Sequence, residues 1–208
     1  MRALVVGASR GIGAQIARVL RERGDEALEA NRSGGFDVTD PDFGGRLRAL
    51  AGDAPLDLLV CNAGIYEDRG MSADDSYPSE LWSRGFAVNV EGPFRAVQAV
   101  LPNLRAAKGK VAIVSSQMGS SRKAGGGSYV YRASKAAATN LAMNLATDLA
   151  PEVAVGAYHP GWVRTDMGGP GAAISPEESA EGLVARFDAL GPGRTGVFET
   201  WDGHAHPA

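Results

Sequence analysis

The sequence has few of the features that mark several large classes of protein. Its 208 residues include one cysteine, Cys61, which excludes an internal disulfide and fits a reducing compartment. The net charge is only −3, and no run of one sign indicates a nucleic-acid or membrane surface. Its apolar runs are too short for a signal peptide or a membrane-spanning helix. These absences predict a cytoplasmic protein without a nucleic-acid or membrane partner.

Groups of metal ligands are also missing. No His, Cys or carboxylate cluster has the spacing of a metal site, so we expect no bound metal. Two of the three histidines, His204 and His206, lie in a polar tail near the end of the sequence. The third, His159, precedes a Pro-Gly turn, and we do not expect it to act as a base.

Apolar content of 44% and charged content of 22% describe an ordinary globular protein. Short apolar runs at residues 2–6, 25–30, 56–61, 110–115, 153–158 and 195–200 alternate with helical patterns, which predicts a doubly wound parallel sheet. No linker or repeat interrupts this order, so a single domain over residues 1–208 is expected.

The second βα unit is predicted to be shortened. Residues 34–39 are too few for a crossover helix before an abbreviated third strand, which Asp37 and Val38 would follow. A helix is then expected to start with Asp40 as N-cap and Pro41 at its first position, and to run to about Ala51.

A glycine-rich turn follows the first strand. Residues 7–13 read GASRGIG, and helical spacing of apolar residues begins at Ile12. In this context Gly7 permits a tight turn, Gly11 a close approach of phosphate, and Gly13 close packing of helix on strand. The sequence therefore predicts a nucleotide site, although a turn that is glycine-rich only for packing stays open.

The end of the second strand bears on the choice of cofactor. In dinucleotide-binding folds a carboxylate there favours a ribose 2′-hydroxyl, whereas arginine favours a 2′-phosphate. Asn31 and Arg32 stand at this point, and Arg10 lies in the glycine turn. We therefore expect NADP(H) to be preferred over NAD(H); two solvent-facing arginines are the alternative.

Three polar groups are predicted to meet in one cleft. Ser115 and Ser116 end the strand at 110–115, and a helix from about residue 128 places Tyr131 and Lys135 on one face. A phenol is a poor acid at neutral pH unless a cation lowers its pKa, and Lys135 is placed to do so. A surface tyrosine and a solvated lysine are the alternative.

The helix at about 78–107 contains Asn89 and Pro93. The proline predicts a kink that frees carbonyl groups near Asn89. Asn89 is then either a tolerated polar residue or a structural donor at the floor of the cleft.

Together these motifs resemble the short-chain dehydrogenase/reductase family over nearly the whole chain. The resemblance rests on GASRGIG at 7–13, Asp37-Val38, Asn62-Ala63-Gly64, Asn89, Ser116, YRASK at 131–135, and Pro160-Gly161 with Thr165. Runs such as SSQMGS and HPGWVRTDMGG are similar to the C-factor-like branch of carbonyl reductases. The family implies a single-domain Rossmann fold and a homodimer or homotetramer assembled through its two long middle helices.

The resemblance also implies a reaction and its residues. The reaction is hydride transfer between NADP(H) and a carbonyl or secondary alcohol, with the tetrad Asn89, Ser116, Tyr131 and Lys135. Ser116 is preferred to Ser115 because the family's catalytic serine lies three residues before a glycine. The implied cofactor-binding residues are Gly7, Ser9, Arg10, Gly11, Ile12, Gly13, Asn31, Arg32, Asp37, Val38, Asn62, Ala63, Gly64, Tyr131, Lys135, Pro160, Gly161, Val163 and Thr165.

Some features lie outside the pattern. A catalytically silent nucleotide-binding protein with a signalling or regulatory role is the alternative function. Segments 66–80 and 166–175 are expected to select the substrate, and Trp162 is a candidate to flank it. The acidic residues of the first segment, Glu67, Asp68, Asp74 and Asp75, are most simply a solvated loop.

Overall fold

The computed structural model describes residues 1–208 and contains one six-stranded sheet in which every neighbouring pair is parallel. The strand order is β2-β1-β3-β4-β5-β6. The strands are β1 (Arg2–Val6), β2 (Glu26–Ala30), β3 (Leu58–Cys61), β4 (Lys110–Val114), β5 (Ala154–His159) and β6 (Val197–Thr200). Short apolar segments form them because a parallel strand between two helical layers is buried on both faces.

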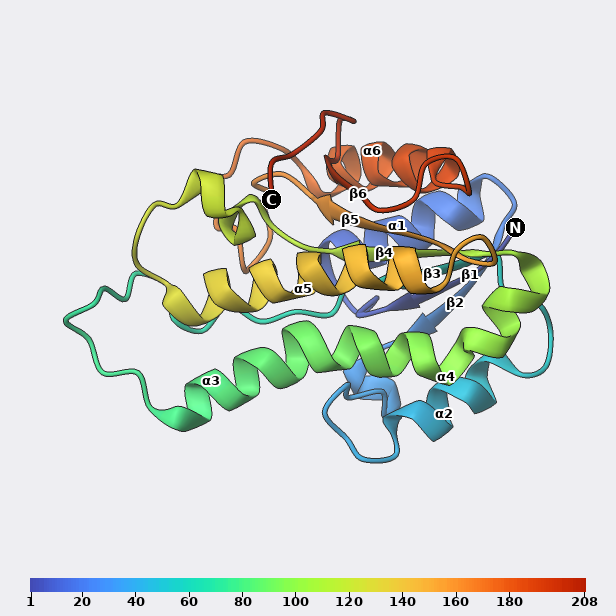
Figure 1. Ribbon diagram of the computed structural model, residues 1–208, viewed down its shortest axis with the longest axis horizontal. Helices are drawn as coiled ribbons and strands as arrows, with labels where there is room; N and C mark the ends of the chain where they lie inside the picture. Colours follow the sequence, from blue (N-terminus) through green and yellow to red (C-terminus); the bar gives the residue numbers. More distant parts are fainter.

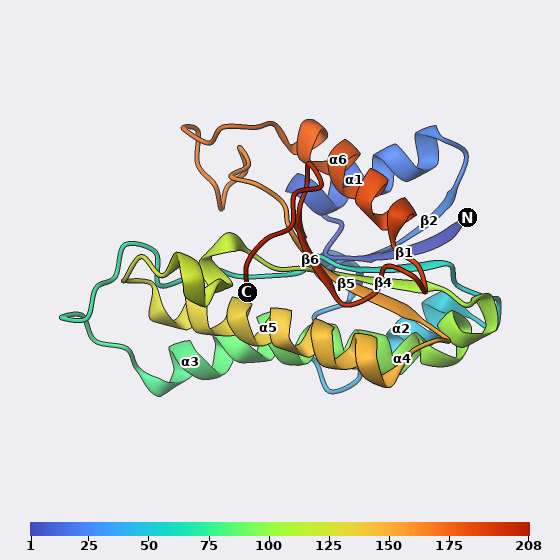
Figure 2. The same ribbon diagram turned by 45° about the horizontal axis from the view of Figure 1, so that its top comes forward.

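Helices cover both faces of the sheet (Figures 1 and 2). One layer holds α1 (Gly11–Glu22) and α6 (Pro176–Ala189), and the other holds α2 (Phe43–Ala51), α4 (Gly92–Ala107) and α5 (Tyr129–Asp148). Side chains alternate along β1: Leu4 and Val6 belong to the core under α2, α4 and α5, whereas Ala3 and Val5 belong to the core under α1 and α6. The predicted three-layer, doubly wound fold is confirmed.

The second βα unit is shortened further than predicted. A 3₁₀ turn, η1 (Arg32–Gly34), follows β2, and no strand forms near Asp37, so β2 is an edge of the sheet. The predicted start of the next helix is wrong. α2 begins at Phe43, because the Asp40 carboxylate accepts the N–H of Asp42 (2.8 Å) and closes a turn ahead of the helix.

The long middle helix changes its winding at the predicted place. α3 (Ser79–Phe86) continues through a π-helical segment, η2 (Ala87–Glu91), into α4. Pro93 has no N–H to bond to the carbonyl of Asn89, so the backbone widens here. Asn89 lies in this segment and is buried. None of the helices combines the length and apolar composition that crossing a membrane requires.

Candidate active site

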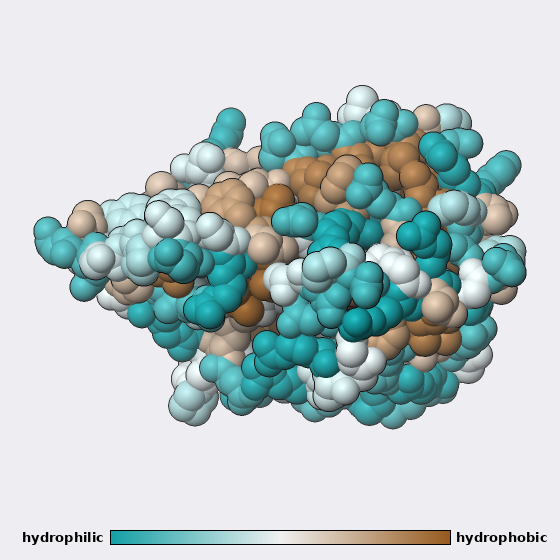
Figure 3. Space-filling model, turned by 90° about the horizontal axis from the view of Figure 1, so that it is seen from below, coloured by the Kyte–Doolittle hydropathy of each residue, from teal (hydrophilic) through white to brown (hydrophobic).

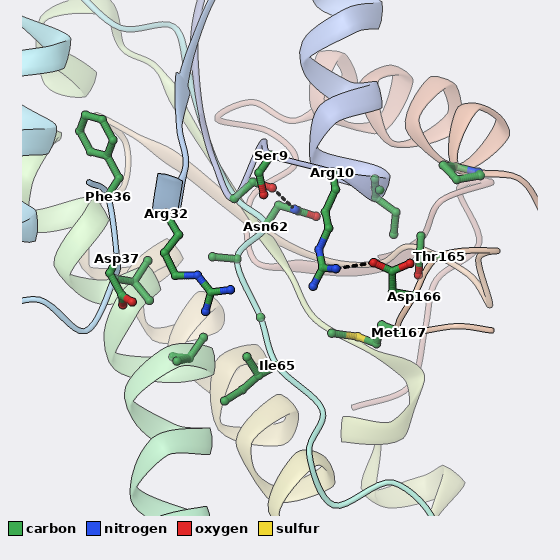
Figure 4. Close-up of a pocket in the computed structure, with 18 of the residues that line it drawn as sticks. Ser9, Arg10, Arg32, Phe36, Asp37, Asn62, Ile65, Thr165, Asp166 and Met167 are labelled. Atoms are coloured by element: carbon green, nitrogen blue, oxygen red, sulfur yellow. Dashed lines mark hydrogen bonds and ion pairs between the residues drawn. The ribbon is translucent and has the colours of Figure 1, made fainter. Parts of the chain in front are cut away.

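A cavity of about 630 Å³ opens at the carboxyl ends of β1 and β3. This is the volume range of cofactor sites, and the carboxyl end of the strands is where parallel α/β sheets bind ligands. Its walls are the glycine turn, the segment after β2, the loop after β3 and a lid, which we define as residues 162–175 (Figure 4). The predicted residues that line it are Gly7, Ser9, Arg10, Gly11, Ile12, Arg32, Asp37, Val38, Asn62, Ala63, Gly64 and Thr165.

The glycine turn is held at backbone contact distances. Gly7 has φ +87°, and a Cβ on it would lie 2.6 Å from the Ala63 nitrogen. A Cβ on Gly13 would lie 2.2 Å from the Gly7 carbonyl oxygen, so helix α1 can pack here only with glycine. No side chain caps the first N–H groups of α1, which begin at the cavity wall. This arrangement leaves backbone donors for an anionic group, as a pyrophosphate requires.

Charged side chains stand around the adenosine end expected from the sequence. Arg32 and Asp37 lie on one side of the cavity, and on the other side Arg10 forms an ion pair with Asp166 of the lid (Figure 4). Asp37 accepts the N–H and hydroxyl of Thr39, and these bonds lower the pKa of its carboxyl group. Asn31 does not line the cavity, because its side chain accepts the Gly34 N–H and the Ser33 hydroxyl and thereby caps η1.

Tyr131 and Ser116 are brought together beside this cavity. Tyr131 lies in the first turn of α5 and Ser116 follows β4. Burial raises the pKa of Tyr131 to about 12, and the interaction of its phenol with the Ser116 hydroxyl acts in the opposite direction. Ser116 accepts the Met118 N–H (3.1 Å), so its own hydroxyl hydrogen remains available.

The neighbouring serine has a different role. Ser115 donates its hydroxyl to the carbonyl oxygen of Lys135 (3.0 Å) and lies 2.7 Å from the Thr139 hydroxyl. These contacts hold β4 against α5 and leave no hydrogen for a ligand. The geometry therefore favours Ser116 over Ser115 as the hydroxyl beside Tyr131.

Lys135 is buried one helical turn after Tyr131. Its Nζ donates to the carbonyl oxygen of Val114 (2.9 Å) and lies 5.8 Å from the centre of the Tyr131 ring. Burial lowers the pKa of Lys135 to about 8. The expected lowering of the Tyr131 pKa by this cation is not seen, because burial of the phenol dominates and the amine is turned toward the β4 carbonyl.

Asn89 ties three elements together. Its amide accepts the Ile65 N–H (2.9 Å) and donates to the Ile65 carbonyl (3.0 Å) and to the Ser134 hydroxyl (2.9 Å). A Cβ on Gly64 would lie 3.3 Å from both the Asn89 Oδ1 and the Lys135 Nζ. Asn89 and Lys135 therefore flank one point of the loop after β3, and glycine keeps that point open.

The turn after β5 mostly builds the base of the lid. Gly161 has φ +88° and packs against Ile174, and Val163 forms a β-bridge with Ile174. The Pro160 carbonyl accepts the hydroxyl of Ser179 in α6 (2.6 Å). Of the four residues predicted here, only Thr165 lines the cavity. Trp162 is 56% exposed and donates its indole N–H to the Gly168 carbonyl within the lid.

Asp68 was assigned to a solvated loop, and that prediction is wrong. It is 1% exposed, and its carboxylate accepts the N–H groups of Val130 (2.8 Å) and Tyr131 (3.2 Å). Asp68 thus caps α5 from a distant loop. Ser128, at the N-cap position, has φ +49° and its side chain forms no hydrogen bond to the first turn of the helix. Nothing local in the sequence marks this contact, since 62 residues separate cap and helix.

Two further side chains of the same loop reach the site. The Tyr66 ring stacks on the Tyr131 ring, with centroids 4.1 Å apart and planes 20° apart. The Arg69 guanidinium lies over the Tyr66 ring, 5.2 Å from its centre. His159, in contrast, packs against His206 and does not line the cavity; burial lowers its pKa to about 4.

Comparison with known proteins agrees with this architecture. Residues 36–173 match the family described as short chain dehydrogenase. The C-signal protein of Myxococcus xanthus is 40% identical over 156 residues, covering 74% of this chain and 93% of that protein. The 1-hydroxy-2-glutathionyl-2-methyl-3-butene dehydrogenase of a Rhodococcus strain is 35% identical over 223 residues, covering 96% of each chain.

Solved structures show the same fold over the full length. NADPH-bound carbonyl reductase from chicken fatty liver superposes with a TM-score of 0.89 at 25% identity, covering 100% of this chain and 98% of that one. A carbonyl reductase of Pseudomonas aeruginosa gives 0.84 at 28% identity, covering 100% and 99%. The chain belongs to the short-chain dehydrogenase family. Its relatives and structural neighbours are named as dehydrogenases and carbonyl reductases, and the chain is an oxidoreductase like them.

Proposed function

We propose that the protein is an NADP(H)-dependent oxidoreductase that interconverts a carbonyl compound and a secondary alcohol through Asn89, Ser116, Tyr131 and Lys135. The observation that carries the proposal is the meeting of the Tyr131 phenol and the Ser116 hydroxyl beside the 630 Å³ cavity, with Lys135 buried behind them. When bound, the nicotinamide cofactor supplies the hydride chemistry.

The residues of the cavity fit such a cofactor. The uncapped N-terminus of α1 offers backbone N–H groups to a pyrophosphate, and Gly7 and Gly11 of the turn line the cavity beside it. Arg32 has no ion-pair partner and Arg10 is held only by an exposed one, so both are available to a 2′-phosphate. NADPH in the chicken enzyme and NADP in a Burkholderia multivorans neighbour, 26% identical with a TM-score of 0.86, support this choice.

Each tetrad residue has a distinct task in the proposal. Tyr131 acts as general acid and gives its phenol proton to the developing alkoxide during reduction. Ser116 donates a hydrogen bond to the same oxygen, which stabilises the charge that develops there. Lys135 returns a proton to the Tyr131 phenolate and binds the nicotinamide ribose. Asn89 fixes the loop after β3 next to Lys135 through its bonds to Ile65.

The proposal is tested by NADPH consumption with a panel of small ketones and aldehydes. The panel includes the carbonyl analogue of a glutathionyl alcohol, because the Rhodococcus relative is named as a dehydrogenase of such a compound. Tyr131→Phe is expected to lose at least a thousandfold in turnover while NADPH fluorescence titration gives an unchanged Kd. Full activity of Tyr131→Phe would show that the acid has been assigned to the wrong residue.

A second function is favoured by one comparison. The relative at 40% identity is named C-signal, which supports a signalling protein that uses the same scaffold. Tight NADPH binding together with no turnover across the panel would favour this alternative. The contact of the Tyr131 phenol with Ser116, with Lys135 buried one turn away, supports the enzyme instead.

We also propose a homodimer or homotetramer that uses α4 and α5. The face in Figure 3 is mostly hydrophilic but carries separate hydrophobic patches. Large hydrophobic side chains exposed on the middle helices include Trp82, Phe94 and Tyr129. Sedimentation analysis across a range of concentrations tests this assembly, and a monomer at all concentrations would contradict it.

A further inference from the structure

Arg69 is a cation without an ion-pair partner in the loop after β3, the loop that contributes Ile65 and Glu67 to the cavity wall. It is exposed, and its guanidinium forms no hydrogen bond or ion pair. The carboxylates that could neutralise it are already engaged. Glu67 pairs with Arg84 (2.8 Å), Asp68 caps α5, and Asp166 of the lid pairs with Arg10. A positive charge is thus left uncompensated in this part of the surface.

The position of Arg69 connects it to the reacting group. Its guanidinium lies over the Tyr66 ring, 5.2 Å from the ring centre, and the same ring stacks on Tyr131. The Tyr66 hydroxyl is 2.8 Å from the Ser128 hydroxyl, which fixes the ring against the start of α5. Arg69 and the proposed acid therefore contact the same aromatic ring.

Arg69 also spans the gap between the two segments expected to enclose the substrate. A Cβ on Gly169 of the lid would lie 3.9 Å from the Arg69 Nη1. Ile65 and Glu67, on the same loop, line the cavity, as does Met167 of the lid. A substrate whose carbonyl carbon lies beside Tyr131 would extend outward between this loop and the lid, past the guanidinium.

We propose that Arg69 is a specificity-determining residue and that the substrate is an aldehyde or ketone bearing a carboxylate. The inference rests on the proposed oxidoreductase function. An arginine guanidinium without an ion-pair partner can donate two parallel hydrogen bonds to a carboxylate. The Tyr66 ring supports the cation by a cation–π contact and limits its rotation.

The experiment compares two substrates that differ in one charge, 4-carboxybenzaldehyde and its methyl ester. The natural protein is expected to have the higher kcat/KM for the acid, and added salt should reduce this advantage. Arg69→Gln should lower kcat/KM for the acid roughly fivefold to tenfold and leave the ester unchanged, since one charged hydrogen-bonded pair is lost. Arg48→Gln, an exposed arginine of α2 without an ion pair, is the matched control.

A binding measurement separates this inference from the proposed function. Benzoate and benzamide are titrated into the NADP⁺-saturated protein, and benzoate is expected to bind more tightly until Arg69 is replaced. Turnover of both aldehydes with equal effects of Arg69→Gln would overturn the inference and leave the enzyme assignment intact. Preference for benzoate that depends on Arg69, without any turnover, would support the anion site and contradict the proposed reaction. An absence of preference in both measurements would overturn the inference.

Discussion

The carboxylate of Asp68 accepts the backbone N–H of Tyr131 at 3.2 Å, so the residue proposed as the acid is held by a side chain from a loop 63 residues earlier. The same carboxylate accepts the Val130 N–H at 2.8 Å. The start of α5 therefore depends on the loop after β3, and the position of the phenol depends on this cap.

Asp68→Ala is predicted to destabilise the fold by about 1–3 kcal/mol, because two buried donors lose their acceptor. It should also lower kcat more than it raises KM, since the phenol is no longer fixed. Urea unfolding and steady-state kinetics measure the two effects. Asp74→Ala, at an exposed position in the same loop, should change the free energy of unfolding by less than about 0.5 kcal/mol.

Asp68→Asn makes a finer distinction. The amide keeps an oxygen acceptor for the helix, but it removes a negative charge that raises the pKa of Tyr131. The pKa of Tyr131 should therefore fall, and the step in the pH–activity profile that reflects ionisation of the phenol is expected at lower pH. A pH profile identical to that of the natural protein would show that Asp68 acts only as a cap.

Asp166→Asn is predicted to improve NADPH affinity by about twofold to fivefold. The side chains of Arg10 and Asp166 are 73% and 74% exposed, so their ion pair contributes little to stability. Breaking it frees the Arg10 guanidinium for a 2′-phosphate. NADH affinity should not change, because NADH lacks that phosphate. Fluorescence titration of both cofactors provides the measurement, with Asp53→Asn on the exposed surface as control. Equal gains for both cofactors would assign Asp166 to lid closure instead.

Arg32→Asp is predicted to shift preference toward NADH, because a carboxylate repels the 2′-phosphate and can bind a ribose hydroxyl. The ratio of kcat/KM for NADPH to that for NADH should fall at least tenfold. If the ratio does not change, the phosphate contact lies elsewhere, and Arg10 is the next residue to replace.

Lys135 should make stability depend on pH in the alkaline range. Burial lowers its pKa from 10.5 to about 8, so between these values the unfolded chain holds a proton that the folded chain has lost. Stability from this group therefore rises as pH increases from 8 to 10.5. The unfolding free energy of the natural protein minus that of Lys135→Met is expected to increase across this window, as measured by urea unfolding. A constant difference would contradict the buried, deprotonating amine.

Much of the fold follows from local sequence because parallel strands and their helices leave strong patterns. The sequence also predicted a kink near Asn89, because Pro93 removes the hydrogen bond to the carbonyl four residues earlier, and the π-helical segment lies there. The start of α2 could not be predicted in this way, because Asp-Pro is equally compatible with a helix start and with the turn that Asp40 makes with Asp42.

In the candidate site, too, residues in local motifs could be predicted, whereas residues that act through tertiary contacts could not. The sequence predicted Gly7, Gly11, Arg32, Ser116 and Tyr131 because such residues are recognisable at short spacing. In the structure the first three line the cavity, and the Tyr131 phenol lies next to Ser116. Asp68, Tyr66 and Arg69 were missed because their roles arise from contacts between a polar loop and α5. Such contacts depend on tertiary packing, which no periodicity in the loop records.

The loss of a strand beyond β2 has a consequence for solubility. β2 is an open edge whose backbone groups could pair with a strand of another molecule. It is only five residues long and carries Glu26 and Glu29, which bind Arg2 and Arg21. A second copy docking edge to edge would bring like carboxylates together and displace these arginines. The shortened unit thus leaves an edge that resists aggregation through its own charge.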